Sequence, residues 1–244
     1  MKKQAFRGPL PDVVVKLKSS EIWQGMITVL RPDFWTLFAI AAPFTVLVDM
    51  TLTLFGPDQP RIPAEYTPRT IVILILIPGL IGAIAQLAVA HMIAHPGKAP
   101  RAALAAGLAA LPAYLAALFL SVLPTGLGFA LLIIPGLYVT ARLFLMVPIA
   151  VVERLGPIPL LKRSWALTEG EGWVILWFLV LAIFFVLGAG LLAQGVGAAL
   201  GSVLTLLGIK AVGSFLASLV SATVTAVFSI ASAAASTIIY LKLR

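Results

Sequence analysis

The sequence predicts an all-α, polytopic membrane protein with six transmembrane helices and three amphipathic helices along its cytoplasmic side. The first observation is composition: 61 % of the 244 residues are hydrophobic and only 11 % are charged, whereas soluble domains carry about 25 % charged residues. The second is that six apolar stretches are long enough to cross a hydrocarbon core about 30 Å thick. The third is that Lys and Arg gather on one side of these stretches. A soluble enzyme, a nucleic-acid-binding protein and a disordered chain are therefore excluded.

The chain divides into a basic cytoplasmic tail, residues 1–19, and a single transmembrane domain, residues 20–244. The tail has no apolar stretch of the length found in a signal peptide, because Pro9 and Pro11 interrupt it. Six spans are expected, at about 33–56, 69–94, 107–124, 127–152, 173–197 and 211–241.

Two of these boundaries depend on breaks in the apolar pattern. The run 108–152 is too long for one span, so we expect a tight turn at the Pro-Thr-Gly sequence 124–126. This turn would make 107–152 a helical hairpin. Gly195, Gly197 and Gly201 predict a Gly-rich link after the fifth span. The short apolar piece at 198–207 could then be a re-entrant or lip segment, which Lys210 ends.

Charge sets the orientation. Thirteen of the 17 Lys and Arg residues fall on the side of the two termini, three fall on the other side, and Arg142 lies inside a span. Cytoplasmic loops carry such an excess of positive charge. All five Trp residues also fall near the predicted cytoplasmic boundary, where aromatic side chains anchor helices. Both termini are therefore expected in the cytoplasm.

An internal repeat is a further feature of the pattern. Residues 20–34, 98–114 and 156–173 are each an amphipathic stretch that leads into a span. Each stretch has a small residue at a comparable position: Gly25, Gly107 and Ser164. This favours a pseudo-threefold repeat of an interfacial helix followed by a hairpin. The alternative is that every membrane hairpin needs a basic, aromatic entry.

The fourth span and the loop after it carry most of the candidate site residues. Pro135 and Pro148 are expected to kink the span, and Gly136 allows a second helix to approach closely. Arg142 lies in the cytoplasmic third of the bilayer, about 24 Å from the outer end of the span. Its side chain could snorkel to the interface, cap carbonyls or pair with Glu153, or bind a lipid phosphate or substrate.

The loop continues into a basic amphipathic helix that contains Trp. Its apolar residues follow an approximate helical stripe, formed by Ile158, Leu161, Trp165 and Leu167. Such a helix lies in the interface and favours anionic headgroups, although it could simply anchor the loop. The candidate headgroup-binding residues are Arg142, Arg154, Lys162, Arg163 and Trp165.

Residues 134–170 resemble the membrane domain attached to some glycerophosphodiester phosphodiesterases, and its stand-alone bacterial relatives. The matching residues are Ile134-Pro135-Gly136-Leu137-Tyr138, Arg142-Leu143, Pro148, Val152-Glu153, Gly156-Pro157, Leu161-Lys162-Arg163-Ser164-Trp165, Leu167-Thr168 and Gly170. The resemblance implies a six-helix protein of the bacterial inner membrane. It also implies a structural motif formed by Pro135, Gly136, Pro148, Glu153, Gly156 and Pro157. It does not extend to the soluble catalytic domain of those enzymes.

Three other groups could carry function. Asp49 lies near the outer boundary of the first span, as an interfacial carboxylate or as a proton or cation site. His91 and His95 have a metal-ligand spacing, but no third ligand is nearby, so no metal or cofactor is expected. The last span has a small residue at every fourth position, in the order Gly213, Ala217, Ser221, Thr225, Ser229 and Ala233. This stripe favours close packing within the chain, or an interface with a second copy or another membrane protein.

We therefore expect a non-catalytic integral membrane protein. It would interact with phospholipids at the cytoplasmic leaflet or serve as an accessory subunit of a membrane complex, with no nucleic-acid partner. The chain has no Cys, no Ser-His-Asp set, no P-loop and no acidic pair with acid–base spacing. The alternative is a small transporter or channel that acts as an oligomer, because spans interrupted by Gly and Pro point to midplane sites.

Overall fold

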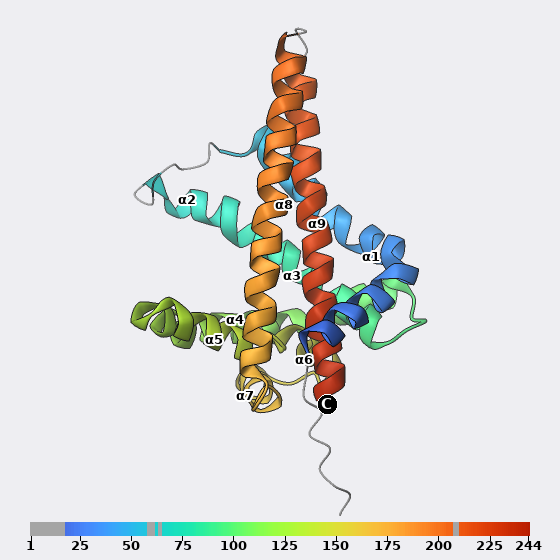
Figure 1. The fold of residues 1–244 in the computed structure, drawn as a ribbon, viewed down its shortest axis with the longest axis vertical. Helices are drawn as coiled ribbons and strands as arrows, with labels where there is room; N and C mark the ends of the chain where they lie inside the picture. Colours follow the sequence, from blue (N-terminus) through green and yellow to red (C-terminus); the bar gives the residue numbers. More distant parts are fainter. Residues whose placement is uncertain (1–17, 58–61, 63–64, 207–209) are drawn as a thin grey trace, which may run out of the picture.

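The computed structural model describes residues 18–57, 62, 65–206 and 210–244, and the regular structure among them is entirely helical (Figure 1). Six helical segments in this part of the chain are long and apolar enough to cross a membrane. They are Ser19–Leu52, Pro68–Ala94, Pro100–Leu131, Ile133–Val152, Gly172–Gly197 and Ser218–Leu243. The prediction of an all-helical protein with six segments of membrane-spanning length is confirmed.

The helices follow one another with short connections. In chain order they are α1 (Ser19–Phe55), α2 (Pro68–Ile71), the π-helical segment η2 (Val72–Leu76), α3 (Ile77–Ala94), α4 (Pro100–Leu131), α5 (Ile133–Arg142), α6 (Met146–Val152), α7 (Pro157–Leu167), α8 (Gly172–Leu206) and α9 (Lys210–Leu243).

Separate interfacial helices at 20–34 and 98–114 are not observed. The first is continuous with its span in α1, through Pro32, and the second is continuous with its span in α4, through Pro112. A proline removes only one backbone donor, whereas a chain break in a bilayer exposes several unsatisfied backbone groups. Only the third amphipathic stretch forms its own helix, α7.

The predicted turn at 124–126 is wrong. Helix α4 continues through this segment to Leu131, and the chain reverses at Leu132, whose backbone is extended. The reversal follows from two glycines that let α4 and α5 touch. A Cβ atom on Gly128 would lie 2.9 Å from the Cα atom of Gly136, and one on Gly136 would overlap the Phe129 ring. The hairpin exists, but it consists of α4 and α5.

The predicted re-entrant segment at 198–207 is also wrong over its described part. Residues 198–206 continue α8 without interruption, and residue 207 lies outside the described residues. The glycines of this helix do not break it, because its surroundings are apolar and a helix satisfies its own backbone groups.

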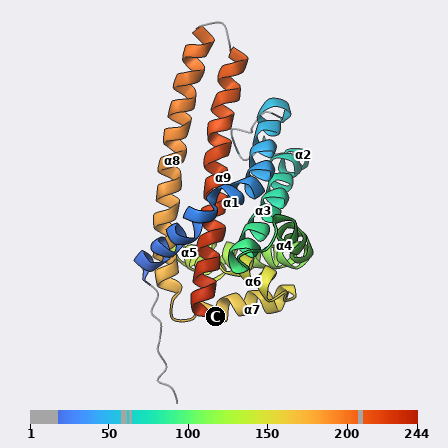
Figure 2. The ribbon, with the colours of Figure 1, turned by 90° about the vertical axis from the view of Figure 1, so that its right-hand side faces the viewer.

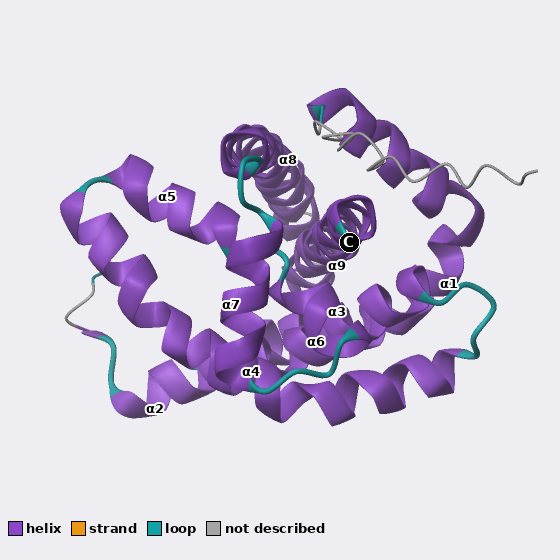
Figure 3. Cartoon of the chain, turned by 90° about the horizontal axis from the view of Figure 1, so that it is seen from below, coloured by secondary structure: helices purple, strands orange, loops and turns teal. Residues whose placement is uncertain are grey.

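Three helical hairpins extend from a common end of the molecule. Helices α8 and α9 run side by side and antiparallel, while α4 and α5 run side by side across their axis (Figures 1 and 3). The third hairpin, from α1 to α3, extends obliquely (Figure 2). We call the common end the base. It is formed by the first turns of α1 and α8, by α6 and α7, and by the last turn of α9.

The core lies directly above the base, where α3, α6 and α9 pack against one another. Leu87, Ile149 and Ile239, one from each of these helices, are completely buried. A salt bridge joins α1 and α9 at the edge of the base, where Lys242 Nζ lies 2.8 Å from Glu21 Oε2. The start of α1 is thereby tied to the end of α9, 221 residues away in sequence.

Candidate functional site

Helix α7 is held at the base by its inward face. Gly156 is the N-cap residue, and Pro157 stands at the first helical position, where the backbone lacks an acceptor for its N–H in any case. Leu160 and Ser164 are completely buried against the body of the protein. The four-residue spacing of these two side chains gives α7 one buried side and one open side.

Arg142 caps the C-terminal end of α7. Its Nη1 donates to the carbonyl oxygen of Thr168 at 2.7 Å, and its Nη2 donates to that of Trp165 at 2.8 Å. The guanidinium carbon lies 4.6 Å from the centroid of the Trp165 ring, and the residue is only 5 % exposed. The last carbonyls of a helix have no partner within it, so this arginine supplies one.

The contact is reciprocal. Helix α5 ends at Arg142, and the carbonyl oxygen of this residue accepts from Ser164 Oγ at 2.8 Å and from Thr168 Oγ1 at 3.2 Å. Each of the two helix ends thus satisfies the other. Gly172 makes the approach of α8 feasible, because a Cβ there would lie 3.0 Å from the Arg142 side chain.

Glu153 joins three elements of the base. Its Oε2 lies 3.1 Å from Arg163 Nε on α7, and its Oε1 accepts from the Tyr240 hydroxyl on α9 at 3.0 Å. The alternative in which Arg142 pairs with Glu153 is therefore wrong: the partner is Arg163. Sequence reasoning did not find Tyr240, and it could not assign Ser164 or Thr168 a partner, because nothing in their neighbourhood marks them as polar contacts.

One of the two prolines of the expected motif lies at a break in its span. The segment of spanning length Ile133–Val152 is interrupted at Leu143–Leu145, between α5 and α6. Pro148 has no N–H to donate to the carbonyl oxygen of Phe144, four residues earlier, which accounts for an interruption here. Pro135 stands at the third position of α5, where a backbone N–H has no partner within the helix, and it interrupts nothing.

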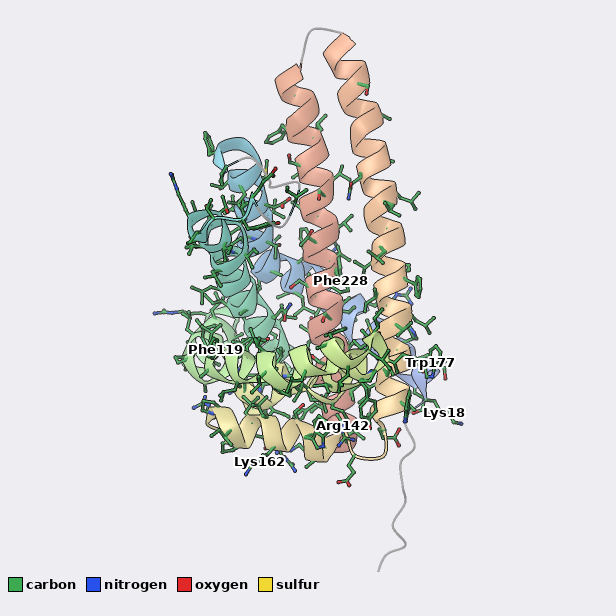
Figure 4. All side chains as sticks on the ribbon, turned by 90° about the vertical axis from the view of Figure 1, so that its left-hand side faces the viewer. Lys18, Phe119, Arg142, Lys162, Trp177 and Phe228 are labelled. Atoms are coloured by element: carbon green, nitrogen blue, oxygen red, sulfur yellow. The ribbon has the colours of Figure 1, made fainter. Side chains whose placement is uncertain are left out.

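The open side of α7 combines positive charge with aromatic and apolar surface. Ile158 is 57 % exposed and Trp165 is 43 % exposed. Lys162 is exposed between them, on the side of α7 that faces away from the rest of the molecule (Figure 4). These three residues, at i, i+4 and i+7, share one side of the helix. We call this surface the α7 face.

Other exposed residues also lie at the base. Arg154 is exposed and stands in the left-handed region with φ of 51°. Trp173 and Trp177, in the first turns of α8, are also exposed. The base therefore presents several cations and indole rings at the same end of the molecule.

An apolar groove of about 280 Å³ runs along the lower half of α8 and α9. Trp23 and Met26 of α1 line it at one end, and Phe228 of α9 lines it farther from the base. Trp23 packs on Phe178 with ring centroids 5.4 Å apart. The groove and the base thus share the first turns of α1.

The small-residue stripe of α9 divides into two parts. Ser229 and Ala233 are buried, and Ala233 packs in a cluster with residues of α1 and α3. Ser221 and Thr225 are exposed. The surroundings of Gly213 and of the Ala217 side chain lie outside the described part of the structure.

His91 of α3 and His95, which directly follows the end of α3, lie together. The rings of His91 and His95 stack with centroids 4.4 Å apart. Across the described part of the chain, no group of three or more His, Cys, Asp or Glu residues could hold a metal ion.

Comparisons with profiles of known families, with curated protein sequences and with solved structures give no match to this chain.

Proposed function

We propose that this chain is a non-catalytic membrane protein whose base binds anionic phospholipid headgroups of the cytoplasmic leaflet. The observation that carries the proposal is the α7 face. Buried polar contacts hold the inner side of this helix against the body of the protein, and its open side carries Ile158, Lys162 and Trp165. A basic, Trp-containing amphipathic helix in the interface attracts anionic lipid.

The proposed headgroup-binding residues are those that face outward. Arg154 and Lys162 are exposed, and the side chain of Arg163 is 40 % exposed while it also contacts Glu153. Arg142 has a different role in this proposal, because both terminal nitrogens already donate to carbonyl oxygens of α7. The apolar groove beside α1 offers room for an acyl chain of a bound lipid.

The proposal includes the topology in which the base, where α1 begins and α9 ends, faces the cytoplasm of a bacterial cell, with both termini on that side. It also includes a pseudo-threefold repeat, which the contacts of the three small residues support. A Cβ on Gly25 in α1 would lie 3.0 Å from Ile238 in α9, and one on Gly107 in α4 would lie 3.1 Å from the backbone of Ala88 in α3. Ser164 in α7 also contacts a returning helix, but through a hydrogen bond: its Oγ donates to the carbonyl oxygen of Arg142 at the end of α5, at 2.8 Å. Each entering helix thus packs on the returning helix of the preceding unit.

Membership of the phosphodiesterase membrane-domain family is also part of the proposal, and it rests on the order of residues 134–170 alone.

The non-catalytic assignment rests on the roles of the charged groups at the base. Arg142, Glu153 and Arg163 contact other parts of the protein and hold α7 in place, so they are positioned as structural groups rather than as an acid–base pair.

The first test is native mass spectrometry of protein extracted in its own lipid. The double variant Arg154→Gln/Lys162→Gln removes two exposed cations, each worth about 1 kcal/mol near an anionic surface. We expect the retention of anionic phospholipid to weaken roughly thirtyfold, since about 1.4 kcal/mol corresponds to a factor of ten.

The matched control is Arg69→Gln, which removes an exposed cation from α2, far from the base. This variant should retain anionic lipid like the wild type. Equal retention by the wild type and the double variant would refute the headgroup site. A stoichiometric protein partner in place of lipid would favour the accessory-subunit function instead.

A further inference from the structure

A second cavity lies between α1, the η2–α3 segment and α9, and Phe228 of α9 lines both this cavity and the apolar groove. Its volume is about 410 Å³. The three helices that enclose it contact one another pairwise, and Figure 2 shows them grouped beside α8. Unlike the groove, this cavity has a polar lining, formed by Thr45, Asp49, Tyr66, Gln86, Thr225 and Ser229.

The polar lining is rich in hydrogen-bond acceptors. Thr45 Oγ1 and Thr225 Oγ1 each donate their only proton to a carbonyl oxygen of their own helix, at 3.1 Å. Their oxygen lone pairs therefore remain as acceptors, and an ionised Asp49 carboxylate is an acceptor only. Gln86 adds an amide oxygen, and its amide NH2, like the hydroxyls of Tyr66 and Ser229, can also donate. The carboxylate of Asp49, when ionised, is the group that favours a positively charged occupant.

Acidic residues are confined to one of the six segments of membrane-spanning length: Ser19–Leu52 contains Glu21, Asp33 and Asp49, and Asp49 is the one nearest the end of that segment. The other five segments of membrane-spanning length contain no Asp or Glu at all. Asp49 is expected near the outer boundary of its span, and an ionisable residue within a spanning segment is a candidate functional group. A cation bound beside it would offset the cost of removing the carboxylate from water.

The size of the cavity indicates an organic cation. Small-molecule sites have volumes of about 300–1,000 Å³, and the volume of this cavity lies within that range. The apolar part of the wall includes the aromatic residues Phe44, Tyr66 and Phe228. Aromatic rings attract alkylammonium groups and also pack against their hydrocarbon part.

One wall of the cavity departs from regular helix geometry. Leu74 and Ile75 lie in the π-helical segment η2, and Gly82 lines the cavity one and a half turns into α3. Such π-helical segments occur frequently at functional sites. A Cβ atom on Gly82 would meet no other atom within 4 Å, so this glycine leaves space that a side chain would otherwise fill.

We propose that this cavity binds a primary ammonium group attached to an apolar body, with the ammonium at Asp49. The ammonium could belong to the ethanolamine headgroup of a phospholipid or to a free alkylamine, since both present the same chemistry to the cavity. The site is separate from the α7 face and does not depend on lipid binding at the base.

The test uses the full chain in nanodiscs of phosphatidylcholine, with n-hexylammonium as the probe in calorimetric titrations. Phosphatidylethanolamine is then mixed into the nanodiscs, and its enrichment on the released protein is measured by native mass spectrometry. Asp49→Asn removes the charge, and Gly82→Leu fills the cavity without touching the carboxylate. We expect Asp49→Asn to weaken binding at least about tenfold, as truncation of one partner of a charge pair does. Gly82→Leu should weaken binding to a similar extent, because the leucine side chain takes up space in the cavity.

The matched control for the filling variant is Gly79→Leu. Gly79 is on the same helix, it does not line the cavity, and a Cβ atom there also meets nothing within 4 Å. This control should bind like the wild type, and it keeps the test valid if Asp49→Asn fails to fold. Loss of hexylammonium binding in both site variants supports a free-amine site, and loss of phosphatidylethanolamine enrichment in both supports a headgroup site. If neither probe binds the wild type, or if both variants bind normally, the proposal is overturned.

Discussion

Replacing Arg142 by leucine is expected to lower the free energy of unfolding by about 3 kcal/mol. The variant loses two hydrogen bonds from a charged donor, to the carbonyl oxygens of Trp165 and Thr168. Each such bond contributes about 1.5–3 kcal/mol, and the buried acceptor left behind adds its own cost. Arg142→Lys should recover less than half of the loss, because lysine cannot present two donors in a planar fork. Thermal unfolding in detergent measures both effects.

The matched control is Arg101→Leu, which removes an exposed arginine from the first turn of α4. Surface substitutions of this kind usually change stability by no more than about 0.5 kcal/mol. The capping role of Arg142 would be disproved if Arg142→Leu unfolded at the temperature of the control. Proteolysis gives a second readout, since α7 should become accessible to protease in Arg142→Leu before the other helices do.

Gly128→Leu is expected to open the α4–α5 hairpin and to destabilise the protein by about 3 kcal/mol, at the upper end of the usual cost of overpacking. Even the Cβ atom would lie 2.9 Å from the Cα atom of Gly136. That contact is with backbone, so no side-chain rotation can relieve it. Spin labels on the two helices would report the change as an increase in the distance between them.

Gly126→Leu is the control for this substitution. Gly126 is two residues away on the same helix, and a Cβ atom there has no other atom within 4 Å. The control should leave the interlabel distance and the unfolding temperature unchanged. Equal effects of the two substitutions would show that helix propensity, and not the contact with α5, requires glycine in α4.

The apolar segments could be read from the sequence because a bilayer imposes a minimum length on whatever crosses it. Helix ends could not be read in the same way. Pro124 and Gly126 signal a turn in a soluble protein, yet α4 passes through both. The reversal six residues later depends on the contact between Gly128 and Gly136, and only the packed structure reveals which glycines touch.

The charged residues of the candidate site could be predicted from the sequence, but their contacts could not. Arg142, Glu153 and Arg163 stand out because charge is rare in this chain. The partners of Arg142 are backbone carbonyls, which any residue supplies. The partner of Glu153 on α9 is Tyr240, 87 residues away. Such contacts follow from how the helices assemble at the base, and no local pattern encodes them.

The cavity around Asp49 shows the same division. The sequence indicates an acidic residue within a span, but its neighbours Gln86 and Thr225 belong to other helices. The small-residue stripe of α9 did not indicate this cavity, although two of its members, Thr225 and Ser229, line the cavity wall.

The most direct test of lipid binding at the base is quenching of tryptophan fluorescence by brominated lipids. Four of the five Trp residues, at positions 23, 165, 173 and 177, belong to the base or to the adjoining end of α1 and α8. Brominated phosphatidylglycerol should quench the wild type more strongly than brominated phosphatidylcholine at the same mole fraction in nanodiscs. The difference should disappear in Arg154→Gln/Lys162→Gln and at high salt. Equal quenching of the wild type by the two lipids would contradict the proposed headgroup site.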